Sequence, residues 1–133
     1  MKKCLLIVFM FGWLVTACSE KTQSLEAFYI EEGIENVDKV VILDGSTGYT
    51  KMLTDIVQIN EFLALVKDIE FSPQDNQEKR VGFLYAITFY DGEVQFNFSL
   101  NQIGDTYYDT NPDIYPIVDE YYERLEIEEK GVW

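Results

Sequence analysis

The chain has 133 residues, 47% of them hydrophobic, and a formal net charge of −14 from 24 acidic and 10 basic side chains. The apolar fraction excludes a wholly disordered chain, and the acidic surplus argues against a nucleic-acid partner, because binding to phosphates needs Lys and Arg. The sequence has no histidine, which removes the commonest general base, the histidine-dependent nucleophiles and the usual zinc sites.

The N-terminal segment has the layout of an export signal. Two lysines give a positive start, an unbroken apolar run covers residues 5–15, and small residues precede Cys18. The apolar run is shorter than the roughly 20 residues that a membrane-spanning helix needs. Residues 15–18, Val-Thr-Ala-Cys, resemble the lipobox of bacterial lipoproteins. This resemblance implies that residues 1–17 are a signal peptide and that Cys18 is lipidated; an ordinary secretory signal cut at the same place is the alternative.

Lipidation accounts for both cysteines of the chain. Cys4 leaves with the signal and Cys18 carries the lipid, so the mature chain has no thiol left for a disulfide. Loss of Lys2 and Lys3 takes the net charge from −14 to about −16, which favours cationic partners. The expected location is the extracytoplasmic face of a bacterial cell membrane, where the domain is stabilised by its packed core alone.

The mature chain is predicted to contain one domain. Residues 18–35, polar at their start, are expected to be the lipidated N-terminus and a tether, although the apolar residues 28–30 also suit a short strand or docking segment. The domain is expected over residues 36–128, and residues 129–133 are expected to be a fraying tail.

The first half of the domain is predicted to be a hairpin followed by a helix. Residues 37–43 and 49–53 are rich in strand-forming residues and flank the turn residues 44–48. Thr54 or Asp55 is a suitable N-cap for a helix that extends to about residue 68. Its predicted apolar stripe consists of Ile56, Ile59, Leu63 and Val66, with Phe62 beside it.

Residues 81–100 predict a second hairpin. Asp91-Gly92 is a strong two-residue turn signal, and a loop made of these two residues pairs Phe89 with Val94 and, further out, Phe83 with Leu100. In this register one face is apolar on both strands and the other is mainly polar or small. The pattern is typical of an antiparallel sheet that is covered on one side.

The last part of the domain predicts a strand and a helix. Residues 106–108 are expected to begin a third strand, and Asn111-Pro112-Asp113 is a helix-start signature. The fold class that follows is α+β, a single small domain in which two amphipathic helices pack on one face of an antiparallel sheet. The apolar stripe of the last helix consists of Ile114, Ile117, Val118, Tyr121, Tyr122 and Leu125.

Four segments of the chain, residues 37–43, 77–82, 90–92 and 111–114, resemble the YhfM-like domain of small bacillar lipoproteins. The resemblance covers about residues 37–125 and depends on strand and turn patterns. It implies a lipoprotein location and this type of domain, and it implies no functional residue.

Acidic residues before the last helix are candidate metal ligands. Asp105, Asp109, Asn111 and Asp113 lie within nine residues, and oxygen ligands suit Ca²⁺. Their spacing does not match an EF-hand, and the alternative is that Asp109 or Asn111 caps the helix while the others form turns. No cofactor is expected, because the chain contains neither a phosphate-loop nor a dinucleotide motif.

Tyr107 and Tyr108 are candidate interaction residues. Neighbouring side chains of a strand point to opposite faces, so one of the two is expected to be exposed, and exposed tyrosines are good recognition residues.

The predicted function is a membrane-anchored, non-enzymatic binding or protein-interaction module. Its partner is expected to be another envelope protein or a peptide, and an inhibitor or immunity lipoprotein is one version of this hypothesis. A calcium- or small-ligand-binding lipoprotein is the alternative. An enzyme is the least expected class. With 24 acidic residues in the chain, some pair of neighbouring carboxylates is expected by chance, so such a pair does not indicate a catalytic site.

Overall fold

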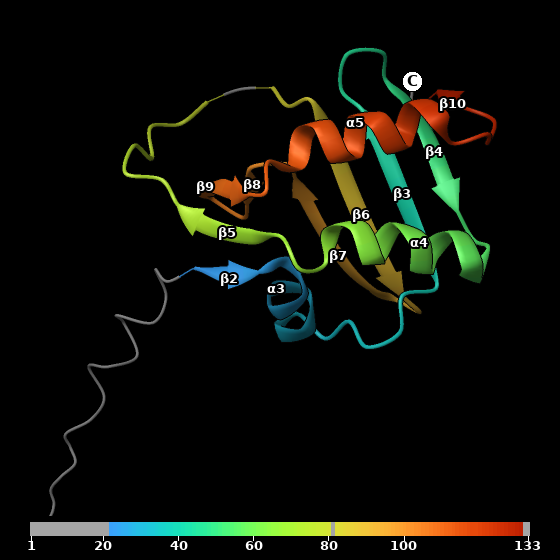
Figure 1. Cartoon of the computed structure of the whole chain (residues 1–133), viewed down its shortest axis with the longest axis horizontal. Coiled ribbons are helices and arrows are strands. Elements are labelled where there is room, and N and C mark those ends of the chain that lie inside the picture. The colour runs from blue at the N-terminus through green and yellow to red at the C-terminus, as the bar shows by residue number, and fades with distance from the viewer. Residues whose placement is uncertain (1–21, 81, 132–133) are drawn as a thin grey trace, which may run out of the picture.

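The computed structural model describes residues 22–80 and 82–131, which form one antiparallel sheet and three helices (Figure 1). The strand order is β10-β4-β3-β6-β7-β8-β9-β5-β2, and every neighbouring pair is antiparallel. The predicted α+β class is confirmed. The strands are β2 (Gln23–Ser24), β3 (Lys39–Asp44), β4 (Tyr49–Leu53), β5 (Glu70–Pro73), β6 (Tyr85–Asp91), β7 (Val94–Ser99), β8 (Gln102–Ile103), β9 (Thr106–Asn111) and β10 (Lys130–Gly131); the helices are α3 (Leu25–Glu31), α4 (Ile56–Val66) and α5 (Ile114–Arg124).

All three helices pack on the same face of the sheet. Phe89 of β6 is fully buried at the centre of this layer, with its ring centroid 5.2 Å from that of Tyr29 in α3 and 6.4 Å from that of Phe62 in α4. Near the other end of β6, the Tyr85 ring lies 5.4 Å from the Tyr122 ring of α5. The sequence predicts two of these helices, and α3 is the additional one.

Side-chain caps begin both predicted helices. Asp55 accepts a hydrogen bond from the backbone N–H of Val57 at 2.8 Å, and Asp113 accepts one from that of Tyr115 at 3.2 Å. Asp113, rather than Asp109 or Asn111, is therefore the cap of α5.

Ile56 was predicted to belong to the apolar stripe of α4, and this prediction is wrong because the residue is not buried. The side chain is 60% exposed, whereas Ile59, Phe62 and Val66 are buried. At 3.6 residues per turn Ile56 lies roughly 60° around the helix axis from Ile59, beyond the half-buried Leu63. It also belongs to the first turn of the helix, where little of the domain is left to cover it.

The β6–β7 hairpin has the predicted faces but a different register. Its ladder runs from Asp91–Val94 through Phe89–Phe96. The loop therefore consists of Gly92 and Glu93, and the predicted pairs are wrong by two residues. A shift of two leaves every side chain on its own face, so the apolar alternation does not reveal it.

Contacts of Asp91 and Gly92 explain the observed register. The Asp91 carboxylate accepts hydrogen bonds from the backbone N–H groups of Asn36 and Glu35 at 2.9 and 2.8 Å, and these bonds lower its pKa. The Gly92 N–H donates to the Asp38 carboxylate at 2.8 Å. Gly92 has φ +61°, a left-handed conformation that glycine adopts without steric cost.

The open end of this hairpin is shorter than predicted. Strand β6 begins at Tyr85, and Phe83 is 45% exposed, so the predicted pairing of Phe83 with Leu100 is wrong. The Gly45 N–H donates to the Leu84 carbonyl at 2.8 Å, and a Cβ at Gly45 would clash with the Phe83 carbonyl oxygen. Residues 83–84 therefore lie against the turn that follows β3.

The N-terminal part of the described chain belongs to the domain. Leu25 and Ile34 are fully buried, and Tyr29 is in the same core. The predicted tether over residues 18–35 is therefore wrong from residue 23 onward, because this segment supplies a strand, a helix and three core side chains. The predicted signal over residues 1–17 and Cys18 lie outside the described residues.

The C-terminal part of the described chain also joins the sheet. Lys130 and Gly131 form β10 and pair with Thr50 and Tyr49 of β4. The expected fraying is therefore wrong at residues 130–131, where the chain forms one edge of the sheet.

Candidate functional site

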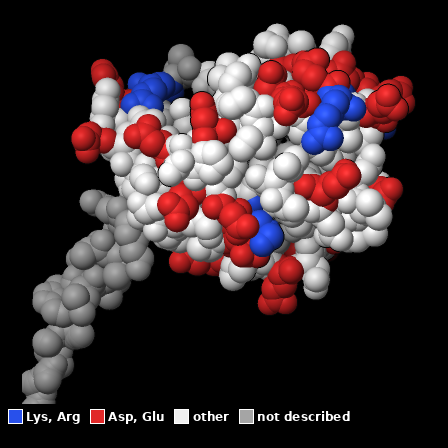
Figure 2. All heavy atoms as spheres, in the orientation of Figure 1, with Lys and Arg blue, Asp and Glu red and all other residues white. Residues whose placement is uncertain are grey.

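Acidic side chains dominate the helix side of the molecule. In Figure 2, which has the orientation of Figure 1, they are spread over the visible surface and outnumber the basic ones. Helix α5 alone carries Asp119, Glu120 and Glu123. Such a surface attracts cations and repels anions.

The four candidate metal ligands do not converge. Asp105 lies in the turn between β8 and β9, whereas Asp109 and Asn111 lie along β9 and Asp113 caps α5. Because a strand rises about 3.3 Å per residue, Asp105 and Asp109 are roughly 13 Å apart. Among residues 22–80 and 82–131, no three His, Cys, Asp or Glu side chains are grouped as metal ligands.

Tyr107 and Tyr108 lie on successive positions of β9, but the expectation that one of them is exposed is wrong. Their side chains are only 5% and 7% exposed. Tyr108 is in the core, where its ring contacts Phe71 at a centroid distance of 5.8 Å. Tyr107 is covered by the polar loop after β5, because the guanidinium of Arg80 lies 4.2 Å from its ring centroid and Gln77 exchanges two hydrogen bonds with its backbone.

A cavity of about 440 Å³ brings two of the predicted acidic residues together. It lies where the start of α5 meets β9 and the ends of β5 and β7. Its size is within the range of small-ligand pockets. It is lined by Gln74, Leu84, Leu100, Asn101, Tyr108, Asp109, Thr110, Asp113, Ile114 and Tyr115, and we call it the Asp109–Asp113 pocket.

Some polar groups of the Asp109–Asp113 pocket already make hydrogen bonds within the protein, and others do not. The Thr110 hydroxyl accepts from the Ile114 N–H at 3.0 Å, and the Gln74 amide donates to the Tyr108 carbonyl at 3.0 Å. Within the described part of the chain, no hydrogen bond or ion pair reaches the Asp109 carboxylate. Among residues 22–80 and 82–131, the Asp109 carboxylate therefore has no bonded partner that would compete with a ligand.

The lining favours a ligand that is both cationic and partly apolar. Asp109 and Asp113 are acidic, and no lining residue is basic. Leu84 and Tyr115 are 58% and 38% exposed, so a ligand reaches them from solvent. The Tyr108 hydroxyl, whose pKa burial raises above its ordinary value, is uncharged at physiological pH as any tyrosine is, so this wall adds no charge. A guanidinium or ammonium group on an alkyl stem has the matching chemistry.

Sequence reasoning found only part of this pocket. Asp109 and Asp113 stand out as acidic residues before a helix, whereas nothing in the local sequence around Leu84 or Gln74 marks either residue as part of a ligand site. The pocket combines five separated segments of the chain, and no local pattern links them.

Comparison with known proteins finds no relative of this chain. No family model, no curated protein and no solved structure matches the chain. No helix formed by residues 22–80 or 82–131 is long and apolar enough to cross a bilayer.

Proposed function

We propose that this chain is a bacterial lipoprotein, attached through Cys18 to the extracytoplasmic face of the cell membrane, whose domain is a non-enzymatic binding module. Its ligand is a basic group, a lysine or arginine side chain, of another envelope protein or peptide. The export signal and the lipobox-like residues 15–18 support the location, in agreement with the resemblance to YhfM-like lipoproteins.

The observation that carries the binding role is the lining of the Asp109–Asp113 pocket. It combines two carboxylates with exposed apolar and aromatic side chains and has no basic residue. The negative field of the whole domain, with a net charge of −14 for the full chain, increases the local concentration of cationic partners. An inhibitor or immunity lipoprotein that binds a basic target is one form of this function.

A binding experiment with a single side chain tests the pocket. We expect Nα-acetyl-arginine methylamide to bind with a dissociation constant in the millimolar range, about −4 kcal/mol. In ¹⁵N NMR spectra, the shifted amides should belong to the residues that line the pocket. Substituting both Asp109→Asn and Asp113→Asn should weaken binding about tenfold, or about 1.4 kcal/mol. The second substitution should still leave α5 capped, because asparagine is as good an N-cap as aspartate.

Matched controls separate this pocket from general charge attraction. Asp105→Asn removes the same charge from a different cavity, one that Gln77 and Arg80 also line, and should leave the affinity unchanged. The uncharged citrulline analogue should not bind. Equal weakening by Asp105→Asn and Asp109→Asn would contradict the proposed site.

The location is tested at Cys18. Cys18→Ala should leave the precursor without lipid and uncut, because the lipid-bearing cysteine defines the processing site. Metabolic labelling with a fatty acid and the size of the protein on gels measure both effects. Mature protein of the usual size on membranes of the Cys18→Ala strain would refute the lipid attachment.

A further inference from the structure

The described chain is fixed to the domain from its first residues. The Thr22 and Ser72 hydroxyls are hydrogen-bonded at 2.7 Å, and Gln23 of β2 pairs with Phe71 of β5. The backbone N–H groups of Leu25 and Glu26 donate to the carbonyls of Ile69 and Lys67 at 2.9 and 3.0 Å. The segment therefore adds a strand to β5 and a helix beside the end of α4.

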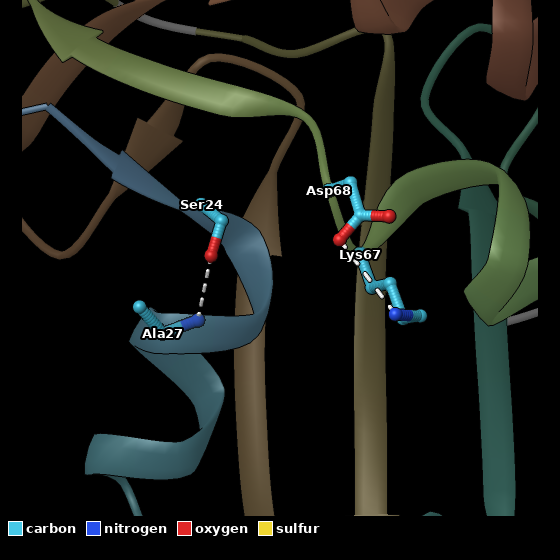
Figure 3. Close-up of polar contacts among 4 residues, drawn as sticks. All are labelled: Ser24, Ala27, Lys67 and Asp68. Atoms are coloured by element: carbon cyan, nitrogen blue, oxygen red, sulfur yellow. Dashed lines mark hydrogen bonds and ion pairs between the residues drawn. The ribbon is translucent and has the colours of Figure 1, made fainter.

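A side-chain cap fixes where α3 begins. The Ser24 hydroxyl accepts a hydrogen bond from the Ala27 N–H at 3.2 Å, next to the end of α4 where Lys67 and Asp68 form an ion pair at 3.6 Å (Figure 3). Leu25, the first residue of α3, is fully buried. Strand β2 and the start of α3 are thus an integral edge of the domain.

Only residues 19–21 separate this edge from Cys18. Four residues span at most about 14 Å even when fully extended. A domain of this size has a radius of gyration of about 13 Å and is therefore at least about 26 Å wide, so the connection is shorter than the domain is wide. A domain connected in this way cannot turn freely above a surface that holds Cys18.

We propose that the edge formed by β2, β5 and the start of α3 faces the lipid headgroups and remains in contact with them, an inference that rests on the proposed lipid attachment of Cys18. The strand order then decides what lies near the bilayer. Strand β9 is the neighbour of β5, and Ser72 and Asp109 are directly paired. At about 4.8 Å between strands, Asp109 is roughly 10 Å from β2.

The opposite end of the sheet is held away from the bilayer. Strand β4 is seven strands from β2 in the sheet order, which corresponds to roughly 30 Å, and the two strands lie at opposite ends of the sheet in Figure 1. The Asp109–Asp113 pocket is therefore in the membrane-proximal part of the domain. It is placed to bind a basic group that a membrane-embedded partner presents at the headgroup level.

The charge of this edge indicates that the tether, not electrostatic attraction, keeps it at the membrane. Glu26, Asp68 and Glu70 outnumber Lys67 there, and acidic groups are repelled by anionic lipids. A longer tether should therefore let the domain leave the surface.

The experiment measures the distance of two matched labels from the headgroups. Glu70→Cys in β5 and Glu123→Cys in α5 replace exposed glutamates at the near and far ends of the domain. Each variant is prepared as the lipidated mature protein and labelled with a fluorophore at the new cysteine. It is then placed in phosphatidylcholine–phosphatidylglycerol vesicles that contain a spin-label quencher on the lipid headgroups. Quenching at residue 70 should exceed quenching at residue 123 several-fold. Circular dichroism checks that both variants are folded.

Inserting about ten Gly and Ser residues after Glu20 adds roughly 35 Å of reach and should abolish most of this difference. Equal quenching at the two positions with the native tether would overturn the inference, as would a difference that the insertion leaves unchanged. Protein that does not float with vesicles at all would instead refute the lipid attachment of the proposed function. The two failures are therefore distinguishable.

Discussion

Replacing Phe89 by Ala should lower the free energy of unfolding by about 3–5 kcal/mol, the usual cost of removing a buried aromatic side chain. The Phe89 ring contacts residues from two helices and from its own sheet, with centroids 5.2 Å from Tyr29, 6.4 Å from Phe62 and 5.7 Å from Phe98. The cavity would open at the point where α3, α4 and the sheet meet. Since domains of this kind are stable by about 5–15 kcal/mol, the variant should be close to unfolding at 37 °C.

Urea denaturation followed by circular dichroism measures this loss. Thr88→Ala is the matched control, because Thr88 is the adjacent residue of β6 and points to the opposite face, where its hydroxyl accepts a hydrogen bond from the Asn97 amide at 2.7 Å. Its cost should be below about 1 kcal/mol. Similar losses for the two variants would show that the helices do not cover the face assigned to them.

Replacing Lys51 by Ala should destabilise the domain by about 2–4 kcal/mol. Lys51 is a buried lysine of β4 on the helix side of the sheet, where its ammonium donates to the carbonyls of Tyr122 and Leu125 at 2.6 and 2.9 Å. It also lies 4.4 Å from the centroid of the Tyr122 ring. These carbonyls belong to the C-terminal end of α5, where a cation is favourable. Its loss removes the charged donor and leaves the two carbonyls only their backbone bonds, from the Leu125 N–H to Tyr122 at 3.4 Å and from the Ile127 N–H to Leu125 at 3.1 Å.

Lys39 provides the control for this prediction. It also lies over a tyrosine ring, 4.3 Å from the centroid of Tyr90, but on the face of the sheet that the helices leave open. Lys39→Ala should cost less than about 1 kcal/mol. Thermal and urea unfolding of both variants test the difference, and a mild effect of Lys51→Ala would mean that solvent or another donor satisfies the end of α5.

The alternation of side chains predicted the faces of the sheet but not every pairing. Tyr49–Leu53 was predicted as a strand and is β4. Thr54 or Asp55 was predicted to cap the next helix, and Asp55 is the residue that caps α4. The hairpin register was not predictable from the same pattern, because a shift of two residues preserves the faces. It depends on Asp91, which bonds to backbone groups more than fifty residues away in the chain.

The N-terminal segment and the pocket show why the rest was not predictable. Three consecutive apolar residues, 28–30, were the only local sign that a polar-looking segment enters the core, and Leu25 gave no sign by itself. One of Tyr107 and Tyr108 was expected to be exposed, because nothing local shows that the loop holding Gln77 and Arg80 folds over Tyr107. The pocket depends on how distant segments meet, and this is a property of the tertiary fold.

The two short strands at the edges of the sheet have a consequence for the proposed attachment of many copies to one membrane. Proteins confined to a surface meet at high local concentration and in similar orientations, the conditions in which exposed strand edges pair with one another. Here the outermost strands, β2 and β10, have only two residues each. Each therefore offers a neighbouring copy very few unpaired backbone groups. In the proposed membrane-attached protein, these short outer strands would limit edge-to-edge pairing between neighbouring copies.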